Sequence, residues 1–205
     1  MRALILAGVA VVAACASSSE PAQAQAQAAP AAVQQYTLDP QHTQIGFSVD
    51  RFGFNNVLGR FDQVTGEVTL DAAHPASSMV HAVVQIANLS SGDPTRDQHL
   101  KGPNWLRSQM FPTMEYRSTA VRVIDSTHAE VTGDLTLLGQ THPLTLNVTL
   151  NHMGVNPASQ RPSAGFSARG TLSRAAWGLA TAPNLIGDQV SITIEALGSA
   201  PAAGN

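Results

Sequence analysis

Apolar and polar residues alternate along most of the chain between Tyr36 and Leu197. A period of two places every second side chain on the same face of a strand, and helical spacing is nearly absent from this region. The pattern therefore predicts an all-β domain whose strands each have one apolar face. The clearest examples are the segments 45–49, 68–70, 80–86 and 190–194.

The most regular stretch, residues 129–150, predicts a hairpin with its turn at Gly139 and Gln140. With that turn, Leu135 lies opposite Leu144 and every large apolar side chain falls on one face. Strands of about ten residues span about 33 Å, which suits a sandwich or a barrel. Aliphatic and small residues dominate the inward positions, and this favours a barrel of about eight strands with room for an apolar ligand.

One stretch, residues 90–111, interrupts the strand pattern. Thr95 and Gln98 have the spacing of a capping box, and Gly102 followed by proline ends the helix before a second short helical run at 104–109. We therefore expect a short helical crossover whose bulky side chains close one end of the barrel. These side chains are Trp105, Leu106 and Met110.

The N-terminus reads as a targeting segment. Residues 3–14 form an unbroken run of small apolar residues after Arg2. Twelve residues at helical rise reach only about 18 Å, against a bilayer core of about 30 Å, so residues 1–14 are expected to be a signal peptide and not a membrane span.

Cys15, the single cysteine, follows Val-Ala-Ala in a pattern that resembles a bacterial lipobox, and lipidation of its thiol is the favoured outcome. Ordinary cleavage at an Ala-x-Ala site is the alternative. Residues 15–35 are rich in alanine, glutamine and serine and are predicted to be a disordered tether with an extent of about 25 Å. The barrel domain is expected at 36–198, followed by a loose tail at 199–205.

Composition narrows the function. The chain has 205 residues, 43% of them hydrophobic and 12% charged, and its formal net charge is −3. The basic residues are scattered, which argues against nucleic-acid binding. A single cysteine cannot form an intramolecular disulfide, and no Cys/His spacing resembles a zinc site, so neither a metal nor a cofactor is expected.

The chain resembles the YceI-like family of bacterial periplasmic proteins through an ordered set of short motifs that covers the whole predicted domain. These motifs are Tyr36, Asp39, His42 and Phe47; Gly53-Phe54; Val57, Gly59 and Phe61; Arg96-Asp97-Gln98-His99-Leu100; Phe111-Pro112 with Tyr116; Gly133-Asp134-Leu135-Thr136; Gly165-Phe166; Arg174; and Trp177-Gly178-Leu179. The resemblance implies an extended antiparallel, lipocalin-like barrel. The resemblance also implies that the apolar pore holds a polyisoprenoid chain and that the protein has no established catalytic activity.

Inward parity and the resemblance together nominate a set of ligand-binding residues. A mouth near Phe52, Phe54 and Trp105 would suit a molecule with an apolar body and an anionic head, which Arg96 or His99 could meet. The full set is Phe47, Phe52, Phe54, Val84, Ile86, Arg96, His99, Leu100, Trp105, Phe111, Leu135, Leu146, Val148 and Phe166.

The function expected from this set is that of a carrier, not an enzyme. The protein would hold an isoprenoid-type or other long apolar lipid, with a role in quinone or polyprenyl-phosphate handling or in a stress response. The alternative is a cell-envelope enzyme with Asp97 and His99 as acid and base; a helix-dipole role for Asp97 would explain the same residues. A structural envelope lipoprotein is a third hypothesis.

Location and partners follow from the same features. We expect the protein in the periplasm, tethered to the outer membrane through Cys15, with a soluble periplasmic form as the alternative. The predicted partners are a hydrophobic lipid and the membrane, and the oligomeric state is open between a monomer and a homodimer. His142 and His152 share a strand parity but are separated by about 33 Å of strand, too far to share a metal ion.

Overall fold

The structure, a computed structural model, describes residues 33–201. The predicted signal peptide, Cys15 and nearly all of the predicted tether lie outside this range. The described chain contains eleven strands. Their bounds are β1 Val33–Leu38, β2 Gln44–Arg51, β3 Asn55–Asp62, β4 Thr65–Asp71, β5 Met79–Gln85, β6 Leu89–Ser90, β7 Thr113–Val123, β8 His128–Leu137, β9 Gln140–Val155, β10 Pro162–Ser173 and β11 Ile186–Ser199.

One α-helix and three short 3₁₀ helices complete the described part. The α-helix, α1, spans Pro94–Lys101, and the 3₁₀ helices are η1 Pro75–Ser77, η2 Ile86–Asn88 and η3 Arg174–Trp177. No helix among residues 33–201 is long and apolar enough to span a membrane.

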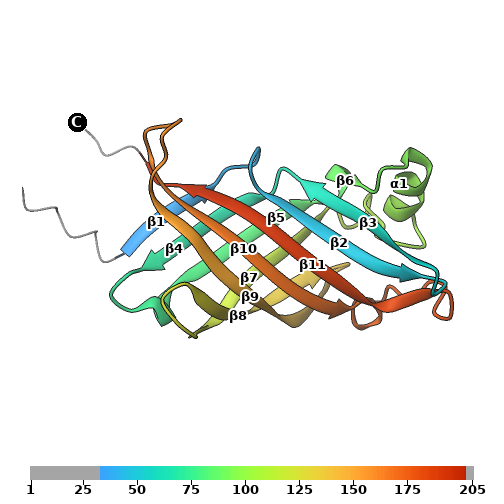
Figure 1. Ribbon diagram of the computed structural model, residues 1–205. Helices are drawn as coiled ribbons and strands as arrows, with labels where there is room; N and C mark the ends of the chain where they lie inside the picture. The colour runs from blue at the N-terminus through green and yellow to red at the C-terminus, as the bar shows by residue number, and fades with distance from the viewer. Residues whose placement is uncertain (1–32, 202–205) are drawn as a thin grey trace, which may run out of the picture. The chain divides into compact units, whose positions relative to one another are not determined.

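The strands form one antiparallel sheet that closes on itself when β1 pairs with β11. The closed ring contains the eight strands β1, β4, β5, β7, β8, β9, β10 and β11. Beyond the ring, β2 pairs with the first half of β11, β3 pairs with β2, and β6 pairs with β3. The predicted all-β fold, an antiparallel barrel of about eight strands with a short helical crossover, is confirmed (Figure 1).

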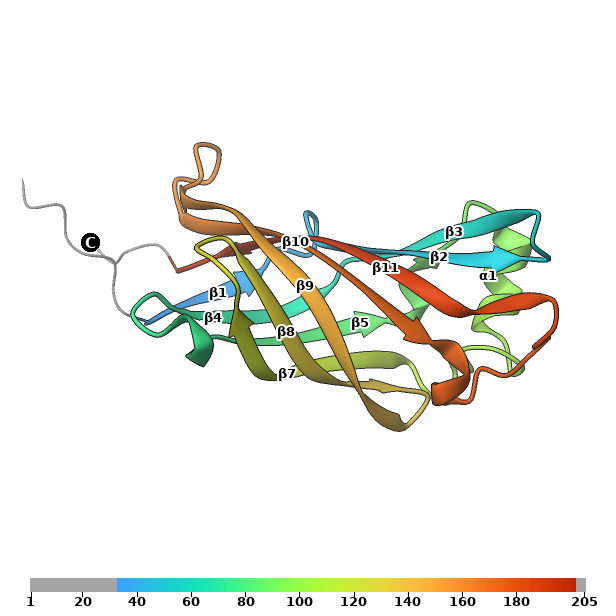
Figure 2. The ribbon, with the colours of Figure 1, turned by 60° about the horizontal axis from the view of Figure 1, so that its bottom comes forward.

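The period-two segments fold as predicted, with their apolar side chains facing the interior of the barrel. Ile45, Phe47 and Val49 of β2 point inward, as do Ile192 and Ile194 of β11. β7, β8 and β9 cross the barrel side by side and form a curved wall (Figure 2). A sheet with one apolar face buries that face when it closes on itself, and closure also removes free strand edges.

The β8–β9 hairpin forms, but its register differs from the predicted one by two residues. Leu135 pairs with His142, not with Leu144, and the turn lies at Leu138 and Gly139. Both turn residues have positive φ, at 55° and 74°, as a type I′ turn requires. A shift of two residues leaves side-chain parity unchanged, so the apolar face stays as predicted.

The crossover helix forms, but its N-terminal cap and the segment after it differ from the sequence expectation. Asp93, and not Thr95, caps α1: its carboxylate accepts hydrogen bonds from the backbone N–H groups of Thr95 at 2.9 Å and Arg96 at 3.0 Å. The bond from Arg96 is the main cause of a lowered pKa at Asp93. The helix ends at Gly102 as expected, but residues 104–109 form turns and not a second helix.

Two glycines let aromatic side chains lie flat against a neighbouring strand. A Cβ at Gly133 would come within 2.5 Å of the Tyr116 ring, and a Cβ at Gly59 would come within 2.2 Å of the Phe47 ring. The Tyr116 hydroxyl donates to the carbonyls of Val131 at 3.0 Å or Leu144 at 3.3 Å. Burial raises the pKa of Tyr116.

Candidate functional site

A cavity of about 400 Å³ runs inside the barrel. All eleven strands contribute to its wall, and so do α1 and the loops that follow it. The wall consists mainly of valine, leucine, isoleucine and phenylalanine side chains. Small-molecule sites are typically about 300–1,000 Å³ in volume and mostly apolar, so the cavity has the size and the chemistry of a ligand pore.

The few polar side chains inside the pore already have protein partners. Thr43 and Tyr116 both bond to backbone carbonyls of neighbouring strands. Among residues 33–201, no buried side-chain nitrogen or oxygen lacks a hydrogen-bond partner. A ligand in this interior would therefore be stabilised by dispersion forces and by the hydrophobic effect. The wall has no buried, unpaired hydrogen-bonding side chain that could hold a polar group of the ligand.

Arg174 closes the pore near α1. Arg174 is only 5% exposed, and its guanidinium donates to backbone carbonyls of the loop before β11 and of the first two residues of β11. Nε donates to Gly187 at 2.8 Å and Nη2 to Ile186 at 2.8 Å, while Nη1 donates to Leu179 and Thr181. These bonds satisfy the buried cation without a carboxylate and hold the loop across the barrel end.

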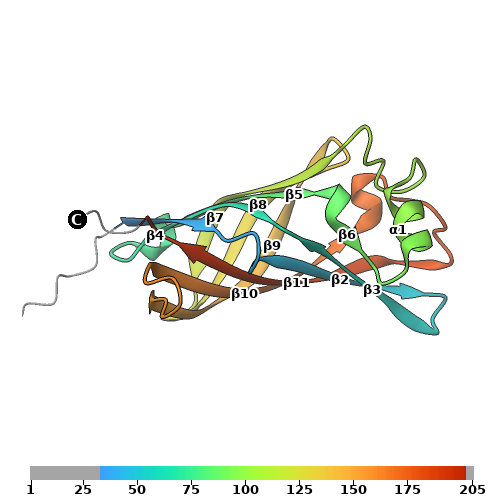
Figure 3. The ribbon, with the colours of Figure 1, turned by 90° about the horizontal axis from the view of Figure 1, so that it is seen from above.

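Aromatic side chains from two other segments complete this closed end. The Trp105 ring, from the crossover, lies 5.9 Å from the Arg174 guanidinium carbon. Trp177 is 3% exposed and its indole N–H donates to the carbonyl of Leu135 at 3.0 Å. Figure 3 shows α1 and the loop between β10 and β11 together at this end of the barrel. The predicted closing role of the crossover residues is visible in Trp105 and Leu106, whereas Met110 is 71% exposed.

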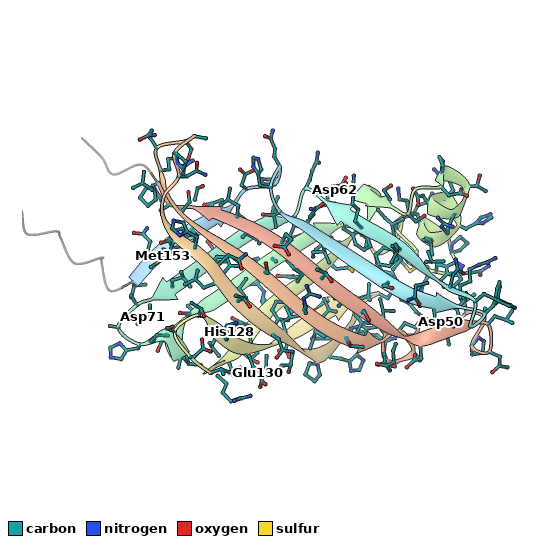
Figure 4. The ribbon with its side chains drawn as sticks, in the orientation of Figure 1. Asp50, Asp62, Asp71, His128, Glu130 and Met153 are labelled. Carbon is teal, nitrogen blue, oxygen red and sulfur yellow. The ribbon has the colours of Figure 1, made fainter. Side chains whose placement is uncertain are left out.

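The opposite end of the pore is open. All wall residues that are exposed to solvent come from two hairpins, β4–β5 and β7–β8. Figure 4 places Asp71 and His128, from these two hairpins, toward one end of the barrel and Asp50 at the other. We call this opening the mouth. Its exposed wall residues are Pro75, Met79, Val123, Asp125, Ser126, Thr127 and His128.

A compact turn shapes one side of the mouth. The Asp125 carboxylate accepts bonds from the backbone N–H groups of Thr127 and His128, both at 2.8 Å, and lies 2.9 Å from the His128 ring. The bond from Thr127, followed by the interaction with the His128 side chain, lowers the pKa of Asp125 to about 2. The turn therefore keeps a negative charge beside the opening at neutral pH.

The structure brings eight of the fourteen sequence-nominated residues together on the pore wall. They share inward parity on their strands or belong to the crossover that covers the closed end. The eight are Phe47, Val84, Leu100, Trp105, Leu135, Leu146, Val148 and Phe166.

Six nominated residues lie off the wall. Phe52 and Phe54 stand 41% and 91% exposed at the β2–β3 turn, because β2 ends at Arg51 and Phe52 adopts φ of 60°, which breaks the strand parity. The sequence predicted a mouth near Phe52 and Phe54, but the opening lies at the opposite end of the barrel. Ile86 is buried behind the wall in η2, and Phe111 packs partly buried against the core.

Arg96 and His99 also lie away from the pore. Arg96 donates through Nε to the Ser91 hydroxyl at 2.9 Å and through Nη2 to the Ser91 carbonyl at 2.7 Å. Asp97 accepts bonds from the N–H and the hydroxyl of Ser91. His99 is exposed on α1. The cluster thus fastens the helix to the strand end before it.

The sequence pattern did not indicate the mouth residues or the four hydrogen bonds by which Arg174 holds the chain across the closed end. Val123 and Ile124 are adjacent apolar residues at a turn, which breaks the alternation and could have marked an exposed apolar rim. Arg174 appeared only as one member of a motif. Nothing in the sequence around it indicates that it donates to four separate carbonyl groups, because the loop that supplies them folds back over the barrel.

The histidine side chains do not form a cluster. The His142 ring packs edge-on against Trp177 at 5.2 Å, while His152 is exposed beyond a β-bulge that changes the parity of β9. Among residues 33–201, no three histidine, cysteine or acidic side chains are grouped as metal ligands.

The closed ring of eight antiparallel strands and its apolar pore define a lipocalin-like barrel. The chain belongs to the YceI-like family, because the model of the YceI-like domain matches residues 36–197. A UPF0312 protein of Pseudomonas putida (strain W619) is 34% identical over 142 residues, which cover 68% of this chain and 73% of the relative.

Solved structures share the fold. BcnA of Burkholderia cenocepacia superposes with a TM-score of 0.70 at 20% identity, over 78% of this chain and 98% of that one. A polyisoprenoid-binding domain from Saccharophagus degradans, implicated in plant cell wall breakdown, superposes with a TM-score of 0.57 at 15% identity, over 81% of this chain and 98% of that one.

Proposed function

We propose that this protein binds a long apolar lipid of the isoprenoid type in its pore and carries it without chemical turnover. The observation that carries the proposal is the continuous apolar wall, which has no buried polar side chain left without a partner. Each Å² of apolar lipid surface removed from water stabilises the complex by about 25 cal/mol, so a lipid chain fits this interior better than a polar metabolite.

The isoprenoid class is supported by the family and by the Saccharophagus degradans domain, whose name describes polyisoprenoid binding. A branched, flexible apolar chain also suits a wall of branched aliphatic side chains that is open at one end. A quinone or a polyprenyl phosphate would meet these requirements. Either would place the function in quinone handling, polyprenyl-phosphate handling or a stress response of the cell envelope.

The proposed location is the periplasm. The apolar run before Cys15 supports export, and the lipobox-like pattern supports a lipid anchor at the outer membrane. A soluble periplasmic form is the alternative. Mass spectrometry of the exported protein would distinguish a lipidated Cys15 from cleavage at an Ala-x-Ala site.

The geometry favours binding over catalysis. An enzyme of this fold would need its acid and base beside the bound substrate. Asp97 and His99 are not part of the pore wall, and Asp97 is engaged by Ser91. Neither side chain is therefore positioned to act on a molecule held in the barrel.

The test is organic extraction and mass spectrometry of residues 31–205. This segment forms one compact unit that contains every described strand and the core, so it can be produced alone. It would be exported to a bacterial periplasm and purified without detergent. We expect a stoichiometric isoprenoid lipid; a blank extract, repeated after incubation with polyprenols and quinones, would refute the proposal.

A pore-filling variant gives the control. Ala82 and Ala196 lie on the wall, whereas Ala120 is exposed and off the wall. Ala82→Phe with Ala196→Phe should remove most of the extracted lipid because the added rings occupy the pore. Ala120→Phe should retain it, and equal retention by both proteins would place the lipid outside the pore.

A further inference from the structure

The mouth carries apolar side chains that face solvent. Met79 is 59% exposed, Val123 is 43% exposed and Ile124 is 53% exposed. Met79 is the first residue of β5, Val123 is the last residue of β7, and Ile124 is the first residue of the β7–β8 turn. We call these three residues the mouth rim. Large apolar side chains grouped at the opening of an apolar pore would be costly in water without an apolar surface to meet them.

Three pairs of charged or titratable side chains lie on the two hairpins near the mouth rim. His74 lies 3.6 Å from Asp71, and His128 lies 2.9 Å from Asp125. Arg122 and Glu130 form a third pair at 2.5 Å. Asp71 and Asp125 leave a small negative charge around the mouth rim. The two hairpins carry no lysine, and their two arginines, Arg117 and Arg122, are paired with Glu115 and Glu130.

The preceding chain joins the barrel at the mouth. Val33, the first residue of β1, pairs with Asp71, the last residue of β4 before the β4–β5 connection. The described chain therefore begins beside the mouth rim and not at the closed end. An anchor at Cys15, as the sequence predicts, would leave residues 16–32 as the link, with a coil extent of about 25 Å.

We propose that the mouth rim docks on the surface of a zwitterionic lipid bilayer, so that the ligand passes directly between the bilayer and the pore. This inference rests on the proposed lipid-binding function. Docking covers the exposed rim and spares the apolar ligand a path through water. The small negative charge, and the pairing of both arginines with glutamates, favour a zwitterionic surface over an anionic one.

The first experiment is flotation of residues 31–205 with phosphatidylcholine vesicles. Met79→Ser with Val123→Ser and Ile124→Ser should reduce the vesicle-bound fraction roughly tenfold, because three partly buried apolar side chains are lost from the contact. The matched control replaces Leu58, Met110 and Leu185 by serine. These are 65%, 71% and 54% exposed and lie off the pore wall.

Equal losses in the two triple variants would overturn the proposal, as would flotation of neither the parent nor the variants. A loss confined to the Leu58, Met110 and Leu185 variant would place the membrane contact on another surface and would overturn it as well. Vesicles that contain phosphatidylglycerol should bind less protein than pure phosphatidylcholine vesicles. Stronger binding to the anionic vesicles would contradict the charge argument.

A second experiment uses a residue off the wall, so that pore capacity is unaffected. Ile124→Trp should show a blue shift of its fluorescence when phosphatidylcholine vesicles are added, because its indole enters the interface. Leu58→Trp should show none. The native tryptophans, Trp105 and Trp177, give the same background in both proteins. An unchanged spectrum for Ile124→Trp would exclude contact at the mouth rim.

Transfer kinetics separate the docking proposal from the proposed function. The probe is a polyprenol carried in phosphatidylcholine vesicles. If the parent and Ile124→Ser, a change off the pore wall, load polyprenol to the same final stoichiometry but Ile124→Ser loads it more slowly, docking is supported. If loading is complete but its rate is equal in parent and variant, docking fails while lipid binding stands. If nothing loads, the proposed function fails first.

Discussion

The two ends of the barrel are built by opposite means. At the closed end, Arg174 and Trp177 are buried and donate to backbone carbonyls of neighbouring segments. At the mouth, short turns carry exposed side chains such as Met79 and Ile124. Buried hydrogen bonds are costly to break, whereas exposed apolar groups contribute little to folding. The comparison suggests that stability resides at one end and ligand exchange at the other.

The strongest test of this division is Arg174→Met. Methionine fills much of the space but leaves the carbonyls of Leu179, Ile186 and Gly187 without donors. Several buried acceptors lose their partners at once, so we expect a loss of about 3 kcal/mol or more in the free energy of unfolding, measured by urea denaturation. Arg169→Met, at an exposed position on β10, is the control and should change it by less than about 0.5 kcal/mol.

Trp177→Phe should have the next largest effect. The change removes the indole N–H that donates to the Leu135 carbonyl and reduces the contact with the His142 ring. The expected loss is about 1–2 kcal/mol, again from urea denaturation. Ile124→Ser provides the comparison at the mouth. If Ile124→Ser destabilised the protein as much as Trp177→Phe, the two ends would not differ in their contribution to stability.

The sequence predicted the strands better than the places where strands stop. Period-two alternation identified the inward side chains because a closed barrel buries one face of every strand. The β8–β9 register was missed by two residues because Leu138, an unfavourable residue for positive φ, occupies the turn. The site was predicted where parity continued, as for Val148. Parity gave the wrong orientation where a turn or a bulge broke it, as at Phe52 and His152.

The mouth could not be predicted because it depends on which hairpins meet after the barrel closes. The β4–β5 and β7–β8 hairpins are about 50 residues apart in the chain, and pairing of β5 with β7 brings them together. The alternation of residues along the chain shows which side chains of a hairpin share a face. It does not show which other hairpin lies beside them. The hydrogen bonds of Arg174 could not be predicted for the same reason, because they depend on how the chain before β11 folds back over the barrel end.

Tyr116, in the half of the barrel nearer the closed end, should make stability sensitive to alkaline pH. Burial, with a smaller contribution from the charge of Asp134, raises the pKa of Tyr116 above its usual value of 10.0. The folded protein therefore keeps a proton that the unfolded chain releases. Its contribution to stability is complete below pH 10 and is lost as the pH rises toward the pKa of the folded state.

Tyr116→Phe tests this expectation. At neutral pH the variant should lose about 1 kcal/mol, because the hydroxyl no longer donates to the carbonyl of Val131 or Leu144. Its urea midpoint should also fall less steeply above pH 10 than that of the parent. The remaining slope would include Tyr36, whose pKa is also raised by burial. An unchanged alkaline slope would remove Tyr116 as its source.

The smallest effect is expected at the mouth and at acid pH. The N–H of Thr127, followed by the His128 side chain, lowers the pKa of Asp125 to about 2 from its usual value of 3.8. Here the unfolded chain binds the proton more readily than the folded protein. The stabilising contribution is therefore present above the unfolded pKa and is lost as the pH falls through 3.8 toward about 2.

Asp125→Asn should remove this acid-dependent contribution and leave the side chain able to accept hydrogen bonds in the turn. Because the carboxylate is half exposed, solvent screens its interaction with His128, and the change at neutral pH should be smaller than that of Trp177→Phe. Urea denaturation at neutral pH and near pH 2, with the Thr127 and His128 amide resonances followed by NMR, provides the measurement. A loss at neutral pH as large as that of Trp177→Phe would mean that the mouth also supports the fold, and the division between the two ends would fail.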